Sequence, residues 1–304
     1  MPHKRVAVTM GDPAGIGPYV TVKALSALAK TRAEFVVFGD AKTLAKYGDL
    51  SAQKNVRIVD MKNTKGVKIG KASALSGMAA YAYLAAAVEE IKKGSVGAVV
   101  TAPVSKEAIT EACGSPFRGH TEFFGDSFGI SDPVMLMVGK RMSVVVMTRH
   151  IPLADVSAAI DPIMVRMTGE VVSSFFQERI GKKRNVRIGV CSVNPHAGLA
   201  TYMGAEEMKI LKGIEPLMKR FDIVGPYPSE GLFMHADEFD CILAAYHDQG
   251  MIPFKLSEFS GGVNVTLGLP CVRTSPAHGT AFDLMKNLAA VDHRPMLAAL
   301  KYVL

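Results

Sequence analysis

Short runs of β-branched and other apolar residues alternate along this chain with longer stretches of helical spacing. The helix-like stretches cover residues 17–28, 73–93 and 163–179. The apolar runs predict buried strands over residues 5–10, 35–38, 56–59, 98–101, 134–138, 143–147, 186–193 and 240–244. Strands and helices in this alternation are typical of an α/β fold with a largely parallel sheet.

One pair of strands breaks the parallel pattern. Residues 134–138 and 143–147 are separated only by Gly139-Lys140-Arg141-Met142, which predicts an antiparallel hairpin and hence a mixed sheet. At 304 residues the chain exceeds the size, about 250–300 residues, at which single cores divide. Because no Pro/Ser-rich linker is present, we expect a two-lobed α/β/α sandwich with a cleft between lobes joined by structural elements.

Composition narrows the class of protein. A hydrophobic fraction of 49% with 21% charged residues and a mean hydropathy of +0.20 excludes a disordered chain. No apolar stretch is long enough for a membrane span, and the start MPHKRVAVTMGD resembles no export signal, so we expect a cytoplasmic protein without membrane partners. The four cysteines stand singly, without a CxxC, and are expected to be buried, reduced thiols.

The net charge of +7 points to an anionic partner. The basic residues are scattered apart from Lys182-Lys183-Arg184, and the chain has no Trp, so nucleic acid is not the expected partner. A small anionic substrate or cofactor explains the charge.

The first glycine-rich segment, Gly11 to Pro18, joins a predicted strand to a predicted helix. Helix N–H groups at such a turn favour anions. The segment is neither a GxGxxG fingerprint nor a Walker sequence, and three glycines in a strand-to-helix turn are also common for structural reasons alone. The residues that bind a cofactor therefore stay unidentified.

Three histidines follow three predicted strands. His150 comes after 143–147, His196 lies in VNPHAG after 186–193, and His247 lies in AAYHDQG after 240–244. Ligands of open α/β sheets bind at the carboxyl ends of strands, where these imidazoles can converge. Three neutral imidazoles suit one catalytic divalent metal, with zinc as the first expectation. Adding the Asp248 carboxylate or a substrate oxygen also admits Co, Mn or Mg.

A second group of polar residues fits an anion. Gly119-His120-Thr121-Glu122 supplies an imidazole and a hydroxyl, although Thr121 can equally cap a helix. Lys255, Asn264 and Arg273 lie among turn-forming glycines and prolines, and Lys and Arg with amide donors can bind phosphate or carboxylate.

These residues sit in motifs that resemble the 4-hydroxythreonine-4-phosphate dehydrogenase family of vitamin B6 biosynthesis. The similar segments recur in family order over almost the whole chain: TMGDPAGIGP (9–18), TAPVSKEA (101–108), GHTEFF (119–124), RHIPLADV (149–156), NPHAG (194–198), YHDQGMIPFK (246–255) and GVNVTLGLPCVRTSPAHGTAFD (262–283).

The resemblance implies an isocitrate/isopropylmalate dehydrogenase-like pair of α/β lobes. We place residues 1–113 and 285–304 in the first lobe and 114–284 in the second, which would carry most metal and substrate ligands. It also implies a homodimer with shared active sites, NAD or NADP as oxidant, and one divalent metal (Zn, Mg, Co or Mn). The implied reaction oxidises a hydroxyl by hydride transfer and then releases carbon dioxide from a β-keto acid.

By motif, the resemblance assigns individual roles. His150, His196 and His247 resemble the metal ligands. The substrate binders would be His120, Thr121, Lys255, Asn264 and Arg273. Asp248 is similar to a carboxylate beside the reacting centre, and Lys255 is a candidate to shuttle the hydroxyl proton.

Four departures from the family pattern leave the substrate open: Tyr19 after Pro18, Leu199-Ala200-Thr201, Glu230, and Leu284-Met285-Lys286-Asn287. Similar enzymes act on 4-phospho-D-threonate or erythronate and on a cis-dihydrodiol carboxylate. Two other classes also remain: a metallohydrolase, since three histidines and an aspartate can activate water, and a non-catalytic ligand-binding protein. NADH formation separates the dehydrogenase from both.

Overall fold

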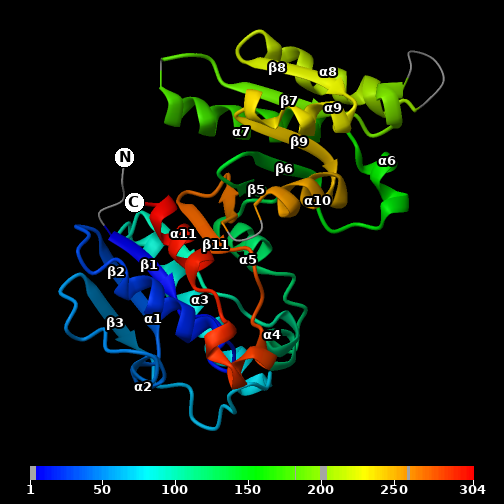
Figure 1. Ribbon diagram of the computed structural model, residues 1–304. Helices are drawn as coiled ribbons and strands as arrows, with labels where there is room; N and C mark the ends of the chain where they lie inside the picture. The colour runs from blue at the N-terminus through cyan, green and yellow to red at the C-terminus, as the bar shows by residue number, and fades with distance from the viewer. Residues whose placement is uncertain (1–4, 182, 199–203, 259–260) are drawn as a thin grey trace. The chain divides into compact units, whose positions relative to one another are not determined.

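The computed structural model describes residues 5–181, 183–198, 204–258 and 261–304 (Figure 1). The chain forms two compact units, unit 1 (Met1–Pro133 with Val263–Leu304) and unit 2 (Val134–Gly262). This division differs from the boundaries at 113/114 and 284/285 expected from sequence. The segment 114–133 stays with unit 1, and the two strands after residue 262 pair into the sheet of that unit.

Unit 1 is built on a sheet with the order β3-β2-β1-β4-β11-β10. All neighbours are parallel except β10, which runs antiparallel to β11. The strands are β1 (Arg5–Thr9), β2 (Glu34–Gly39), β3 (Val56–Asp60), β4 (Ala98–Thr101), β10 (Val263–Leu267) and β11 (Val272–Pro276). β1, β2 and β4 are almost wholly buried, as their unbroken Val, Ala and Phe runs predict for strands covered on both faces.

The helices of unit 1 begin where the sequence supplies caps. Ser73 caps α3 by accepting a hydrogen bond from the Ser76 N–H at 3.3 Å, and Ser105 caps the next helix. Gly77 allows close packing of these two helices, because a Cβ there would lie 2.1 Å from the Ala108 carbonyl oxygen. The elements are α1 (Gly17–Ser26), α2 (Ala41–Ala45), α3 (Ala74–Lys92), α4 (Lys106–Cys113), α5 (His120–Phe128), α11 (Arg294–Tyr302), and the 3₁₀ turns η4 (Phe282–Lys286) and η5 (Leu288–Ala290).

The strands of unit 2 are ordered β5-β6-β9-β7-β8. The predicted hairpin is confirmed: β5 (Val134–Val138) pairs antiparallel with β6 (Ser143–Thr148). β9 (Cys241–Tyr246), β7 (Arg187–Cys191) and β8 (Asp222–Tyr227) continue the sheet in parallel. The helical elements are η1 (Leu153–Asp155), α6 (Val156–Ala159), α7 (Pro162–Ile180), η2 (Pro195–Gly198), α8 (Glu206–Met218), α9 (Ser229–Met234), η3 (Ala236–Glu238) and α10 (His247–Ser257).

The predicted mixed, mostly parallel α/β class is confirmed. Three strands were missed: β8, β10 and β11, with sequences DIVGPY, VNVTL and VRTSP. Their Gly, Pro and polar residues obscure the apolar pattern on which strand prediction depends. The four cysteines are unpaired, and three are buried as expected, but Cys113 at the end of α4 is exposed. Among the described helices, none is both long and apolar enough to cross a bilayer.

Candidate active site

A buried arginine lies on one face of the unit 1 sheet. Arg273 on β11 is only 2% exposed. Its Nε and Nη2 donate to the Thr101 hydroxyl at 3.2 and 2.6 Å, and its Nη1 donates to the Thr266 hydroxyl at 3.2 Å. Thr266 stands directly opposite Arg273 across the β10–β11 ladder, and Thr101 ends β4 beside β11. The two hydroxyls therefore fix the plane of the guanidinium.

The partners of Arg273 leave its charge unbalanced. Within the described ranges, no carboxylate forms an ion pair with the guanidinium. Burial lowers the pKa of Arg273 to about 9, and the charge on Glu122 acts in the opposite direction. Guanidinium carries five N–H donors, so each terminal nitrogen retains one N–H after its bond to threonine. A pair of N–H groups on a buried cation matches a bidentate oxyanion.

Two more shielded polar atoms belong to predicted binding residues of unit 1. The Asn264 Oδ1 and the His120 Nε2 have no hydrogen-bond partner among the residues that the structure describes. Asn264 stands two residues before Thr266 on β10, so its side chain shares the sheet face of Thr266 and Arg273. Buried polar atoms without partners are uncommon in proteins, and one explanation is a ligand that supplies the bond.

His120 and Thr121 occupy the first turn of α5. The helix begins after Gly119, whose φ of 148° strongly favours glycine. Thr121 is buried, and His120 is partly buried. Burial lowers the pKa of His120 well below 6.5, and the nearby charges of Arg273 and Lys106 lower it further. His120 is therefore a neutral imidazole at physiological pH.

The neutral state of His120 gives stability a pH dependence. The unfolded chain takes up a proton at this histidine near pH 6.5, whereas the folded chain does not, so the free energy of unfolding falls as pH drops below that value. We expect His120→Gln to reduce this slope by up to about 1.4 kcal/mol per pH unit. Urea unfolding at a series of pH values below neutrality measures the slope, and an unchanged slope in the variant contradicts the assignment.

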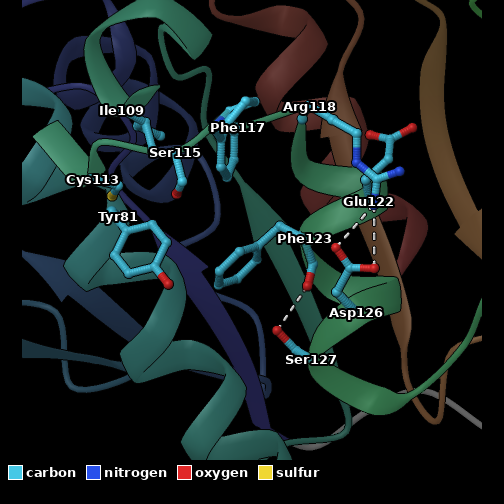
Figure 2. A pocket seen from close by; sticks show the side chains of 12 residues that line it. Tyr81, Ile109, Cys113, Ser115, Phe117, Arg118, Glu122, Phe123, Asp126 and Ser127 are labelled. Carbon is cyan, nitrogen blue, oxygen red and sulfur yellow. Dashed lines mark hydrogen bonds and ion pairs between the residues drawn. The ribbon is translucent and has the colours of Figure 1, made fainter. Parts of the chain in front are cut away.

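A hollow of about 350 Å³ lies beside the same helix (Figure 2). The rings of Tyr81, Phe117 and Phe123 line it, with Tyr81 and Phe123 edge to face at 5.5 Å. An exposed ion pair between Arg118 and Asp126 borders it at 3.1 Å. The lining includes Gly119 and Glu122 but none of the predicted binding residues.

Two of the three predicted metal ligands lie side by side in unit 2. β6 and β9 are parallel neighbours with Thr148 opposite Tyr246. His150 and His247 follow these residues, and their rings lie 5.7 Å apart between centroids. The His247 Nδ1 contacts the Asp248 Oδ1 at 2.8 Å. A carboxylate on Nδ1 favours the tautomer in which Nε2 keeps a lone pair for a metal.

His196 reaches the same sheet edge from β7, the other neighbour of β9. It is exposed in η2, where His196 and Ala197 both adopt left-handed conformations with φ of 54° and 53°. Such conformations cost about 1–3 kcal/mol each for residues other than glycine and cluster at functional sites. Across the described residues, no three His, Cys, Asp or Glu side chains are grouped to hold a metal. A single chain thus brings two imidazoles, those of His150 and His247, close together. Imidazole nitrogens are suitable ligands for a divalent metal.

Lys255 lies two turns after His247 on α10. Partial burial lowers its pKa. Asp248 is exposed in the first turn of the same helix. The structure therefore carries His247, Asp248 and Lys255 on one element.

The first glycine-rich segment is buried and hydrogen-bonded within unit 1. Gly11 to Pro18 are all buried, and the N–H groups of Asp12 and Ile16 donate to the carbonyls of Pro103 and Thr280. The Asp12 carboxylate accepts from the Ala14 N–H and the Ser76 hydroxyl, and burial raises its pKa. These contacts occupy the N–H groups of Asp12 and Ile16 within the segment.

The residues that depart from the family pattern lie in different structural elements. Leu199-Ala200-Thr201 lie outside the described residues. Glu230 is exposed in the first turn of α9, where an acidic side chain suits the helix dipole. Residues 284–287 form part of η4 and its end, after Ala281 with φ of 42°.

Comparison with known proteins decides the family. Residues 18–303 match the model of the family described as "Pyridoxal phosphate biosynthetic protein PdxA". The chain belongs to the PdxA family. It is 36% identical to the 4-hydroxythreonine-4-phosphate dehydrogenase of Aquifex aeolicus, with 94% of each chain covered. It is 38% identical to the D-threonate 4-phosphate dehydrogenase of Cupriavidus necator, covering 97% of this chain and 95% of the relative.

Solved structures agree with this membership. A crystal structure of 4-hydroxythreonine-4-phosphate dehydrogenase from Klebsiella pneumoniae matches this PdxA-family chain with a TM-score of 0.84 at 33% identity, covering 99% and 98% of the two chains. An isocitrate dehydrogenase from Methylococcus capsulatus shares the fold alone, at 11% identity and a TM-score of 0.50. The expected family and fold are confirmed. As a PdxA-family member, the chain is a dehydrogenase that oxidises a CH–OH group with decarboxylation.

Proposed function

We propose that the protein carries out the NAD(P)-dependent oxidative decarboxylation of 4-hydroxythreonine 4-phosphate in pyridoxal phosphate biosynthesis, in the cytoplasm. The observation that carries this proposal is the buried Arg273, which has a free N–H on each terminal nitrogen and no carboxylate partner among the described residues. A small phosphorylated acid supplies the oxyanion that such a cation lacks.

The polar residues of unit 1 bind and orient this substrate. Arg273 receives an oxyanion at its two remaining N–H groups. The Asn264 amide and the neutral His120 imidazole also contact the substrate, through the Oδ1 and Nε2 atoms that lack a hydrogen-bond partner in the described residues. Thr121 adds a hydroxyl at the start of α5. Because His120 is uncharged, it can accept or donate a hydrogen bond without adding a second cation to the one on Arg273.

Unit 2 supplies the metal ligands. His150, His196 and His247 would hold one divalent ion, with Asp248 fixing the His247 ring. When bound, such an ion would supply a Lewis acid for the hydroxyl oxygen of the substrate. Zinc fits three imidazoles, and Mg, Co or Mn become suitable when oxygen ligands are added.

Lys255 is the proposed acid–base group. Its lowered pKa makes the neutral amine more accessible, so the Nζ lone pair would accept the proton of the substrate hydroxyl, while NAD(P) would supply the hydride acceptor. The same Nζ returns a proton after carbon dioxide departs. Asp248 acts through His247 rather than on the substrate.

The enzyme functions in this proposal as a homodimer with shared active sites. A single chain pairs His150 with His247 but groups no third ligand with them in its described residues, which supports a partner's contribution.

Mixing inactive variants tests this sharing. If His196 comes from the partner, heterodimers of His196→Ala and His247→Ala contain one intact site, and random mixing restores about a quarter of wild-type activity. Mixing His150→Ala with His247→Ala restores none, since both ligands come from one chain. Light scattering that shows a fully active monomer contradicts the dimer.

NADH formation with a substrate panel tests the function itself. We expect turnover that requires both metal and a phosphorylated substrate, with 4-hydroxythreonine 4-phosphate used best. D-threonate 4-phosphate belongs in the panel because a relative at 38% identity carries that name. If D-threonate 4-phosphate is turned over faster than 4-hydroxythreonine 4-phosphate, D-threonate 4-phosphate is the substrate. Hydrolysis without NADH formation indicates a metallohydrolase, and tight binding without turnover indicates a binding protein.

A further inference from the structure

The loop that carries His196 is hydrogen-bonded to a buried carboxylate. Glu207 in the first turn of α8 is 8% exposed. Its Oε1 accepts hydrogen bonds from the backbone N–H groups of Val193 and Asn194 at 3.1 and 2.8 Å. Both of its oxygens also lie within bonding distance of the Asn194 Nδ2, at 3.2 and 3.0 Å. One carboxylate thus holds two consecutive residues just before His196.

The neighbouring Glu206 extends this attachment toward the segment that follows His150. Its Oε2 accepts from the Asn194 Nδ2 at 3.1 Å, and its Oε1 accepts from the Ser157 hydroxyl on α6. The Lys209 Nζ also donates to the Ser157 carbonyl at 3.3 Å. The start of α8 therefore connects the chain after β6 with the chain after β7.

The residue just before Val193 is held independently of Glu207. Gln249 on α10 donates to the Ser192 carbonyl at 2.8 Å and accepts from the Ala245 N–H at 2.6 Å. Between these attachments and the left-handed pair His196 and Ala197, the backbone has little freedom. A buried oxygen that accepts from two consecutive backbone N–H groups is a strong restraint, because moving either residue would leave a buried polar group without its partner.

We propose that Glu207 is a positioning residue that fixes the His196 loop in the conformation required for metal binding. The carboxylate acts through the Val193 and Asn194 backbone, and this role rests on the assignment of His196 as a ligand. Outer groups that orient metal ligands are worth about 10- to 100-fold in metal affinity.

The test measures Co²⁺ affinity of the metal-free protein by visible absorption. Glu207→Leu removes every acceptor, and we expect it to weaken Co²⁺ binding by about 10- to 100-fold and to alter the absorption spectrum of the bound ion. Glu207→Gln removes the same charge but keeps one oxygen for the two backbone bonds, so its affinity stays within about threefold of wild type. Glu215→Leu, at an exposed position later on α8, is the matched control and leaves affinity unchanged.

His196→Ala separates this proposal from the metal assignment. If it weakens Co²⁺ binding while Glu207→Leu does not, the positioning role is overturned and the ligand assignment stands. If His196→Ala leaves Co²⁺ affinity intact, the ligand assignment fails and the role of Glu207 fails with it. If Glu207→Gln and Glu207→Leu weaken Co²⁺ binding equally, the loss comes from the missing charge rather than the missing hydrogen bonds, and the proposal is overturned.

A second variant keeps the proposal testable if Glu207→Leu does not fold. Asn194→Ala removes the side-chain bonds to the same carboxylate and leaves the backbone bonds in place. We expect Co²⁺ affinity to fall by about threefold or more, with faster hydrogen exchange at the Val193 and Asn194 amides. Wild-type affinity together with wild-type exchange overturns the proposal.

Discussion

His247→Ala is expected to lose bound metal and to lower kcat by at least about a hundredfold. The substitution removes both a ligand and the group that Asp248 orients. Metal content after gel filtration and NADH formation at saturating substrate measure the two losses. His235→Ala is the matched control, because this imidazole is 64% exposed and its ion-pair partner is Glu238 rather than a predicted ligand. Full metal content together with full activity in His247→Ala contradicts the metal site.

Arg273→Met is expected to lower kcat/KM for the phosphorylated substrate by at least about tenfold, since a charge-assisted contact is typically worth ~1.5–3 kcal/mol. The dephosphorylated analogue, already a poor substrate, loses much less if Arg273 holds the phosphate. Equal losses for both compounds move the contact to the carboxylate group of the substrate.

Arg273→Met is also expected to affect the stability of the ligand-free protein. A buried cation without a counter-ion is costly, so an apolar side chain of similar length should leave the melting temperature of the ligand-free protein unchanged or raised. Arg273→Lys keeps the charge but loses the fork between Thr101 and Thr266, and is expected to lose activity without a gain in stability. A large drop in melting temperature with Arg273→Met makes the arginine a structural residue.

The sequence predicted most of the fold because parallel strands buried on both faces are continuous apolar runs. Val6–Val8 and Val99–Val100 are of this kind, and their strands were located correctly. β10 and β11 were missed because Asn264 and Arg273 interrupt the apolar pattern. Asn264 and Arg273 are also proposed to bind substrate. The apolar pattern that predicts strands is therefore weakest where function requires polar side chains on the sheet.

The site was predicted unevenly. The neighbouring positions of His150 and His247 follow from strand ends, which sequence periodicity can locate. The roles of Thr101 and Glu207 could not be found this way. Thr101 meets Arg273 from 172 positions away, and Glu207 acts through backbone N–H groups that leave no side-chain pattern.

A crystal structure with the phosphorylated substrate, grown without NAD(P), would show directly whether Arg273 binds the substrate. We expect an oxyanion of the substrate within hydrogen-bond distance of both Arg273 Nη1 and Nη2, with the Asn264 amide and the His120 ring as neighbours. A substrate bound with full occupancy and no oxyanion on Arg273 would rule out this binding role.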